Sequence, residues 1–352
     1  WEELGMSVIR AAELLIEKIK TDYKDDIALV VIMGSYIYGE THSKSDLDMF
    51  FVPNTERGYN LGFTFVLEGI GFDYWPISWE RLERIANFDE RITSIITEGK
   101  VLYYSSAADI ERYNQIKKKA LDTRERKKFI NKASEKFNEV YKVYWELLNA
   151  YNISDARKYA IGIINTITYA LALLNGITVK RGRGKLKQEI LNMPLVPDGF
   201  SELYDTAFTI SDIDAFKKAY GQLIQSTEIL ILREKEKISE KVSFVGALNG
   251  FYEEMINFYN KIYHACETRD AVTALFVSVE LTNEIEQVLK DTGVSSKHLP
   301  DLVGAFDPNN LEPLVSTAQN HQVKFVELLT ANGVNIRQFT SFDDLKIYLD
   351  LL

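Results

Sequence analysis

Two apolar runs separated by a polar loop dominate the first part of the chain. Ile27–Met33 is an unbroken apolar run rich in β-branched residues, and Met49–Val52 is a second, shorter one. Runs of this length and composition predict buried strands. Residues 2–20 place apolar side chains at helical spacing, so we expect a helix before the first strand.

The mixture of strand and helix patterns continues up to residue 106. Gly71–Ile77 and Lys100–Tyr104 predict two further strands, and Ser78 is a typical cap for a helix that follows it. Residues 59–68 fit either a helical or a strand period, and we expect a short helix there.

Beyond residue 106 the strand pattern stops and helical periodicity takes over. This change predicts an α+β fold in which a small mixed-sheet domain, residues 1–106, precedes an all-α helical-bundle region. A charge-rich segment near residue 238 divides the helical region. We therefore expect a bundle domain at 107–238 and a C-terminal helical region at 239–352.

The composition is that of a globular protein with more than one domain. The 352 residues are 46% apolar and 26% charged, which leaves enough apolar surface for several cores. Cys266 is the single cysteine, so an internal disulfide is excluded and a reducing, cytoplasmic location is expected. No apolar run is long enough to predict a membrane span, and the acidic first twenty residues do not resemble a secretory signal.

The net charge of −10 is concentrated near the start of the chain. Residues 1–106 contain 10 basic and 18 acidic residues, whereas residues 107–352 contain 31 and 33. This balance argues against nucleic acid as a partner, because phosphate backbones are bound mainly through Lys and Arg. It suits a cationic small substrate, although an acidic surface that serves only solubility is an equally good interpretation.

Two carboxylates open the second predicted strand. Asp46 and Asp48 are separated by one residue, so both side chains lie on the same face of an extended chain. Such a pair is costly unless a cation lies between the two acids, and Mg²⁺ takes oxygen ligands of this kind together with substrate phosphates. Gly34-Ser35, at the end of the first strand, is typical of a turn that presents backbone N–H groups and a hydroxyl to an anion.

A third acid, Asp73, lies on the next predicted strand. An Asp-x-Asp pair alone is often a solvated turn, and Gly-Ser is an ordinary turn sequence. The order and spacing of the three acids together favour a catalytic site. The assignment of Asp73 depends on strand register, because a slip of one residue would turn it to the opposite face and leave Glu68 as the nearest substitute.

This order of motifs resembles the nucleotidyltransferase superfamily typified by DNA polymerase beta. The segment TEGKVLYYSS is also similar to the end of the catalytic domain in small bacterial members, and the resemblance covers about residues 25–106. It implies that residues 1–106 form the catalytic domain and that Asp46, Asp48 and Asp73 are catalytic residues and Mg²⁺ ligands. Asp73 is also the candidate general base toward an acceptor hydroxyl.

A basic loop in the helical region offers further phosphate ligands. Lys180–Lys185 reads KRGRGK, which lacks the Walker pattern and could equally be a solvated surface loop. His42 lies in the polar loop before Asp46 and is a weaker candidate for contact with phosphate. The candidate nucleotide-binding residues are Gly34, Ser35, Ser45 and Lys185.

We expect an enzyme that transfers a nucleoside monophosphate, AMP from ATP, to a hydroxyl of a small molecule. A catalytic domain followed by a helical bundle resembles the aminoglycoside and lincosamide nucleotidyltransferases, which implies a cationic antibiotic as acceptor, a bundle on the substrate side and a homodimer. Two alternatives stay open. One is a protein-modifying or toxin–antitoxin nucleotidyltransferase, and the other is a nucleotide-binding module without catalysis.

Overall fold

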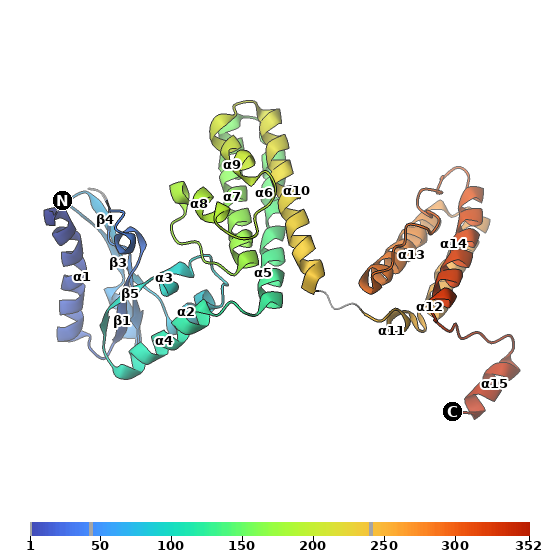
Figure 1. Cartoon of the computed structure of the whole chain (residues 1–352), viewed down its shortest axis with the longest axis horizontal. Helices are drawn as coiled ribbons and strands as arrows, with labels where there is room; N and C mark the ends of the chain where they lie inside the picture. The colour runs from blue at the N-terminus through green and yellow to red at the C-terminus, as the bar shows by residue number, and fades with distance from the viewer. Residues whose placement is uncertain (1, 42–44, 239–241) are drawn as a thin grey trace. The chain divides into compact units, whose positions relative to one another are not determined.

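The computed structural model describes residues 2–41, 45–238 and 242–352, and it divides into two compact units (Figure 1). The first unit is Trp1–Ile238 and the second is Ser239–Leu352. The first unit contains a sheet followed by helices, and the second is entirely helical among its described residues. The prediction of an α+β fold with a mixed sheet before a helical region is therefore confirmed.

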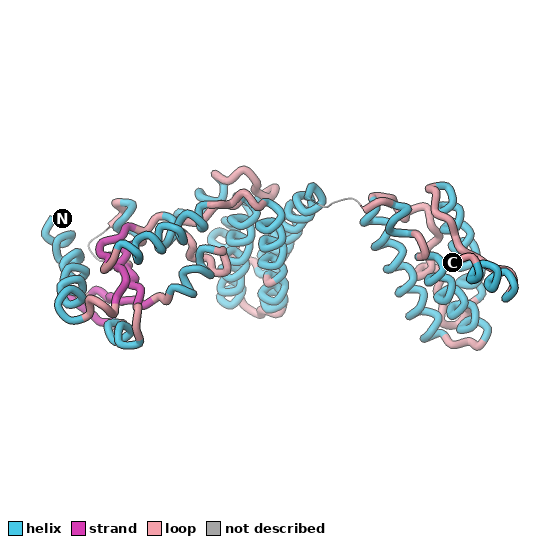
Figure 2. Tube along the Cα trace, turned by 90° about the horizontal axis from the view of Figure 1, so that it is seen from below, coloured by secondary structure: helices cyan, strands magenta, loops and turns pink. Residues whose placement is uncertain are grey.

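Five strands form a single mixed sheet in the first unit (Figure 2). They are β1 (Ile27–Ile32), β2 (Met49–Pro53), β3 (Phe63–Leu67), β4 (Ile70–Pro76) and β5 (Lys100–Tyr104). Their order across the sheet is β3-β4-β2-β1-β5. The β2 and β4 strands are parallel, and the other neighbouring pairs are antiparallel.

Helices cover both faces of the two central strands, so every residue of β1 and β2 is buried. This explains why these strands are unbroken apolar runs rather than alternating sequences. One face packs against α1 through side chains such as Leu15 and Ile19. The other face packs against the helices that follow β4, through side chains such as Leu82 and Ile116. These covering helices are α1 (Glu2–Asp22), α2 (Trp79–Ala86), α3 (Ser94–Thr97) and α4 (Ala107–Leu121).

The prediction of a helix at residues 59–68 is wrong. A short 3-10 helix, η2 (Glu56–Leu61), is followed by the edge strand β3, which pairs with β4. The two strands are joined by Glu68 and Gly69, whose φ angles are +53° and +79°. Two consecutive positive φ angles are typical of a tight hairpin turn. The apolar spacing of residues 59–68 fits both a helix and a strand, and pairing with β4 favours the strand.

The helical part of the first unit is built around α7. It packs against α5, α6 and α10, and it ends at Gly176, whose φ of +63° is typical of a glycine that terminates a helix. The helices of this part are α5 (Arg126–Asn138), α6 (Val140–Leu148), α7 (Ile153–Asn175), α8 (Arg183–Leu191), α9 (Phe200–Thr209) and α10 (Ile213–Ile238).

Phe88 connects the sheet part to this bundle. Its ring packs edge-on against Phe129 of α5 with 4.9 Å between ring centroids, and its carbonyl accepts a 3.0 Å hydrogen bond from the Tyr169 hydroxyl of α7. Asp89 forms an ion pair with Lys132 of α5. The segment that follows α2 is therefore held against the bundle on two sides.

The second unit has its own apolar core, formed mainly by α12, α13 and α14. Its buried His321 accepts a hydrogen bond of 2.7 Å from the Tyr259 hydroxyl when Nδ1 is unprotonated, and burial lowers the pKa of His321 to about 4. Within the described ranges, no helix has the length and apolar character needed to cross a membrane. The helices of this unit are α11 (Phe244–Leu248), α12 (Phe251–Glu267), α13 (Ala271–Thr292), α14 (Glu312–Ala331) and α15 (Phe342–Asp350).

Candidate functional site

A pocket of about 690 Å³ lies where β1 ends and β2 begins. The chain leaves β1 through the 3-10 helix η1 (Gly34–Tyr38) and returns to β2 through residues 45–48. The β3–β4 hairpin and the segment 180–183 complete the walls. Five of the residues predicted from the sequence line this pocket, namely Gly34, Ser35, Ser45, Asp46 and Asp48. His42 lies outside the described residues.

Gly34 brings the backbone of η1 into direct contact with Asp48. Its φ is +74°, and a Cβ atom added there would lie 2.0 Å from Oδ2 of Asp48. The amide of Met33 also donates a 2.9 Å hydrogen bond to the carbonyl of Asp48. A side chain at position 34 is therefore opposed twice, by the backbone conformation and by the carboxylate that lies over it.

The pKa of the Asp48 carboxyl is raised above its ordinary value. Loss of water around the carboxyl is the first cause and the negative charge of Asp46 is the second, while Arg183 acts in the opposite direction. The charge of Asp46 thus opposes the ionisation of Asp48 when no cation lies nearby. A divalent cation would remove this cost.

Asp73 lies beside Asp48 on the neighbouring strand. Met49 pairs with Tyr74 in the parallel ladder, so Asp48 and Asp73, each one residue earlier, are at the same level. Met49 and Tyr74 pack toward α1, and because side chains alternate along a strand, the two aspartates belong to the opposite face. Asp73 is exposed and is not part of the pocket lining.

The carboxylates fit Mg²⁺ only together with a further ligand. Among the described residues, no group of three or more His, Cys, Asp or Glu side chains is arranged to hold a metal ion. Mg²⁺ is usually bound by one or two carboxylates plus substrate phosphates, and Asp46 and Asp48 supply that number of carboxylates in one pocket. The donor set therefore suits Mg²⁺ that arrives with a nucleotide.

A basic segment that joins α7 to the start of α8 lines the same pocket as these carboxylates. Lys180, Arg181 and Arg183 line the pocket together with Arg91. Lys185, the candidate predicted from the sequence, lies on the first turn of α8 and is not part of the lining. Among the described residues, neither Arg91 nor Arg183 has an ion-pair partner within 4.0 Å.

Several contacts hold this segment against α8 and against the sheet domain. The Glu189 carboxylate accepts hydrogen bonds from the backbone amides of Lys180 at 2.7 Å and Arg181 at 2.8 Å. The Lys180 ammonium lies 3.0 Å from Glu98. The Arg181 guanidinium lies 4.7 Å from the ring centroid of Tyr38, and Nε of Arg181 is 3.6 Å from Glu40. No pattern in the sequence points to Arg91, Tyr38 or Glu40 as site residues, since their approach depends on tertiary packing.

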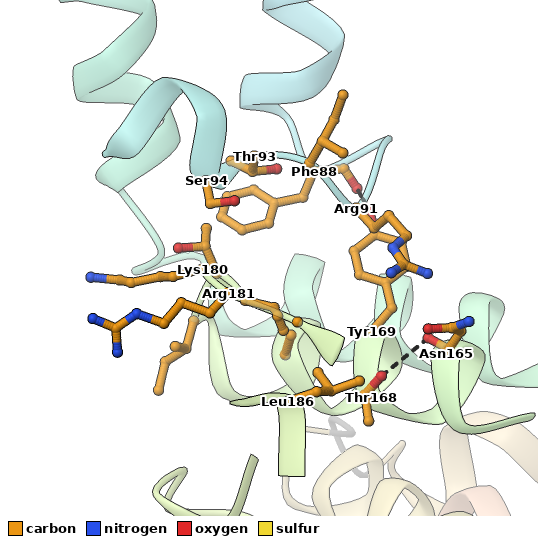
Figure 3. A pocket seen from close by; sticks show the side chains of 16 residues that line it. Phe88, Arg91, Thr93, Ser94, Asn165, Thr168, Tyr169, Lys180, Arg181 and Leu186 are labelled. Atoms are coloured by element: carbon orange, nitrogen blue, oxygen red, sulfur yellow. Dashed lines mark hydrogen bonds between the residues drawn. The ribbon is translucent and has the colours of Figure 1, made fainter. Parts of the chain in front are cut away.

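A second, smaller pocket of about 210 Å³ adjoins the first and shares four lining residues with it. The shared residues are Arg91, Lys180, Arg181 and Gly182. Figure 3 shows the pocket between the segment that carries Phe88, Thr93 and Ser94 and the helix α7, with Asn165, Thr168 and Tyr169 on the α7 side. Sequence analysis did not identify this pocket, because the α7 residues in it have the spacing of an ordinary core face.

Comparison with known proteins adds little to this description. No protein-family model and no curated protein matches the chain. Among solved structures, a nucleotidyltransferase-like protein from Exiguobacterium sibiricum 255-15 is similar, with 10% sequence identity and a TM-score of 0.39 over 63% of this chain and 77% of that chain. A TM-score this low supports no conclusion about function.

Proposed function

We propose that this chain is a nucleotidyltransferase that moves a nucleoside monophosphate, AMP from ATP, to a hydroxyl group of a small molecule. One observation carries the proposal. A single pocket has two neighbouring carboxylates, Asp46 and Asp48, on one wall and the cations of residues 180–183 on another. A triphosphate with bound Mg²⁺ satisfies both walls at once, because its phosphates match the cations and its metal matches the carboxylates.

In the proposed reaction the acceptor oxygen forms a bond to the α-phosphorus of the nucleotide. The bond from this phosphorus to the oxygen that bridges to the β-phosphate breaks, and pyrophosphate leaves with that electron pair. The hydroxyl proton passes to a carboxylate, and Asp73 is the proposed acceptor because it lies at the level of Asp48 and is exposed.

The other residues have binding and orienting roles in this proposal. Arg181 and Arg183 neutralise charge on the phosphates, and the turn at Gly34-Ser35 brings its backbone and hydroxyl to the same pocket. Asp46 and Asp48 would hold Mg²⁺, which when bound offsets the negative charge that develops on the phosphate oxygens.

The acceptor is proposed to be a small, hydroxyl-bearing, cationic molecule, on the basis of the acidic balance of residues 1–106. A second candidate function is nucleotide binding without transfer. It is favoured by one observation, that Asp73, the proposed proton acceptor, is exposed and does not line the pocket. In that case the chain would bind Mg²⁺ and nucleotide but would not release pyrophosphate.

Pyrophosphate release separates these two functions. The chain is incubated with Mg²⁺, each of four labelled nucleoside triphosphates, and panels of aminoglycosides, lincosamides, RNA and protein. We expect pyrophosphate release and a labelled acceptor with one panel, and loss of both in Asp48→Asn. The matched control is Asp25→Asn, because Asp25 is an exposed carboxylate beyond the far end of β1.

Two results would contradict the proposal. Equal turnover by wild type and Asp48→Asn would remove Asp48 from the chemistry, and absence of turnover in all panels despite nucleotide binding would favour the non-catalytic function. Asp73→Asn then separates roles. If this variant binds Mg²⁺ and ATP normally but does not transfer, Asp73 accepts the proton, whereas weaker metal binding would make it chiefly a ligand.

A further inference from the structure

The smaller pocket lies where a ligand of the larger one would extend. Arg91, Lys180 and Arg181 belong to both linings, so a molecule whose phosphates lie among these cations has its remaining part next to the smaller pocket. The volume of about 210 Å³ is below the roughly 300–1,000 Å³ of pockets that hold whole ligands. It therefore fits one ring system of a larger molecule.

The lining of the smaller pocket excludes a polycationic ligand. It contains three cationic side chains and no carboxylate. Its other residues combine apolar surface, such as Phe88 and Leu186, with neutral polar groups. A flat, uncharged ring with polar edges matches this combination, because apolar walls favour its faces and neutral hydrogen-bonding groups favour its edge.

Three polar side chains of the pocket have unused hydrogen-bonding capacity. The hydroxyls of Thr93, Thr168 and Tyr169 already donate to backbone carbonyls at 2.8, 2.7 and 3.0 Å. Among the described residues, the side-chain amide of Asn165 and the hydroxyls of Ser94 and Thr178 have no hydrogen-bond partner, and only Asn165 offers both a donor and an acceptor group on one amide. An amide offers a donor and an acceptor side by side, which is the arrangement that pairs with the edge of a nucleobase.

The order of the strands separates this pocket from Asp73, toward which the acceptor hydroxyl is proposed to approach. Asp73 is on β4, on one side of β2, whereas residues 88–94 precede β5, which lies beyond β1 on the other side. Asp73 belongs to neither lining. If the acceptor hydroxyl approaches Asp73, the pocket under α7 is left for the nucleotide that donates the transferred group.

We propose that the smaller pocket binds the nucleobase of the donor nucleotide, with Asn165 and Ser94 as the residues that determine base preference. This inference rests on the proposed function. The nucleotide would span both pockets, with its phosphates in the larger pocket beside Asp48 and the shared cations, and its base between Phe88 and α7.

The test compares nucleotides with inorganic tripolyphosphate, which has the phosphates but no base. Affinities of Mg²⁺ complexes of ATP, GTP, CTP, UTP and tripolyphosphate are measured by calorimetry for wild type, Asn165→Leu and Ser94→Ala. We expect Asn165→Leu to weaken the preferred nucleotide on the order of tenfold, as lost hydrogen bonds to one base edge imply, and to reduce the preference among the four. The affinity for tripolyphosphate should not change.

The control is Asn131→Leu, because Asn131 is an exposed asparagine on α5 that lines neither pocket. Thermal unfolding of each variant verifies that the fold is retained. Unchanged nucleotide affinities in both pocket variants, with transfer by wild type intact, would overturn the nucleobase assignment and leave the proposed function standing. The nucleobase assignment would also be overturned if the pocket variants lost affinity for tripolyphosphate as much as for nucleotides, or if only the KM of the acceptor changed. Failure of wild type to bind any of the four nucleotides would overturn both proposals.

Discussion

Replacing Gly34 by alanine tests whether the site depends on the contact between η1 and Asp48. The added methyl group would lie 2.0 Å from Oδ2 of Asp48, whereas ordinary contacts begin at 3.4 Å. The carboxylate or the turn must therefore shift by more than 1 Å. A displacement of about 1 Å in a catalytic group can reduce the rate about a hundredfold, and we expect a loss of that order in kcat/KM.

The same substitution has a separate, smaller effect on stability. Alanine at a φ of +74° costs about 1–2 kcal/mol relative to glycine. For a unit of this size, each kcal/mol lowers the unfolding temperature by about 2–4 °C. The fold should therefore survive, with a modest decrease in Tm.

Gly39→Ala is the matched control for this experiment. Gly39 has a φ of +67°, but nothing lies within 4 Å of the position where its Cβ would be. Gly39→Ala should therefore show the decrease in Tm without the loss of activity. Pyrophosphate release measures activity. Mn²⁺ binding, followed by electron paramagnetic resonance, measures the metal affinity of the carboxylates directly. Equal losses of activity and of Mn²⁺ affinity in the two variants would refute the role of the contact with Asp48.

Three further predictions concern other parts of the molecule. Glu189→Ala removes the acceptor of two backbone amides and should weaken binding of ATP and of tripolyphosphate alike, about tenfold by calorimetry, whereas Glu189→Gln should retain part of the affinity. Asp48→Asn should abolish transfer yet raise the free energy of unfolding near pH 7. The reason is that the raised pKa of Asp48 means that its ionisation disfavours the fold, a cost that grows as the pH rises through that pKa. The second unit should lose stability as the pH falls from 6.5 toward 4, by up to about 3 kcal/mol, because His321 binds its proton more weakly in the folded state. His321→Gln should remove this dependence in denaturant titrations followed by circular dichroism.

Features that depend on neighbouring residues could be predicted from the sequence. The two central strands are unbroken apolar runs because helices cover both of their faces, and such runs are recognisable without a structure. Gly34 and Asp48 are separated by one loop between two adjacent antiparallel strands, so a strand pairing expected from sequence order brings them together.

Features that depend on distant packing could not be predicted. The basic character of Lys180–Lys185 is evident in the sequence, but its position beside Asp48 depends on contacts between distant residues, such as Lys180 with Glu98 and Arg181 with Tyr38. Arg183 lines the pocket and Lys185 does not, and this difference depends on where α8 begins. Gly182 and Arg183 both have positive φ angles, which turn the chain into that helix. No sequence pattern predicts Asn165 as a site residue, since it lies on a helix face with ordinary core spacing.

Residues with a strained backbone are concentrated around the two pockets. Among the described residues, four that are not glycine have a positive φ, and three of these adjoin the pockets. Phe88 lines the smaller pocket, Arg183 lines the larger one, and Glu68 precedes the hairpin glycine that lines it. Each such residue costs of the order of 1–3 kcal/mol, and Arg183 is not part of the apolar core of the bundle. Replacing Arg183 by glycine should therefore stabilise the first unit toward thermal unfolding. It should also weaken tripolyphosphate binding because the guanidinium is lost, and an unchanged affinity would show that Arg183 does not contact the phosphates.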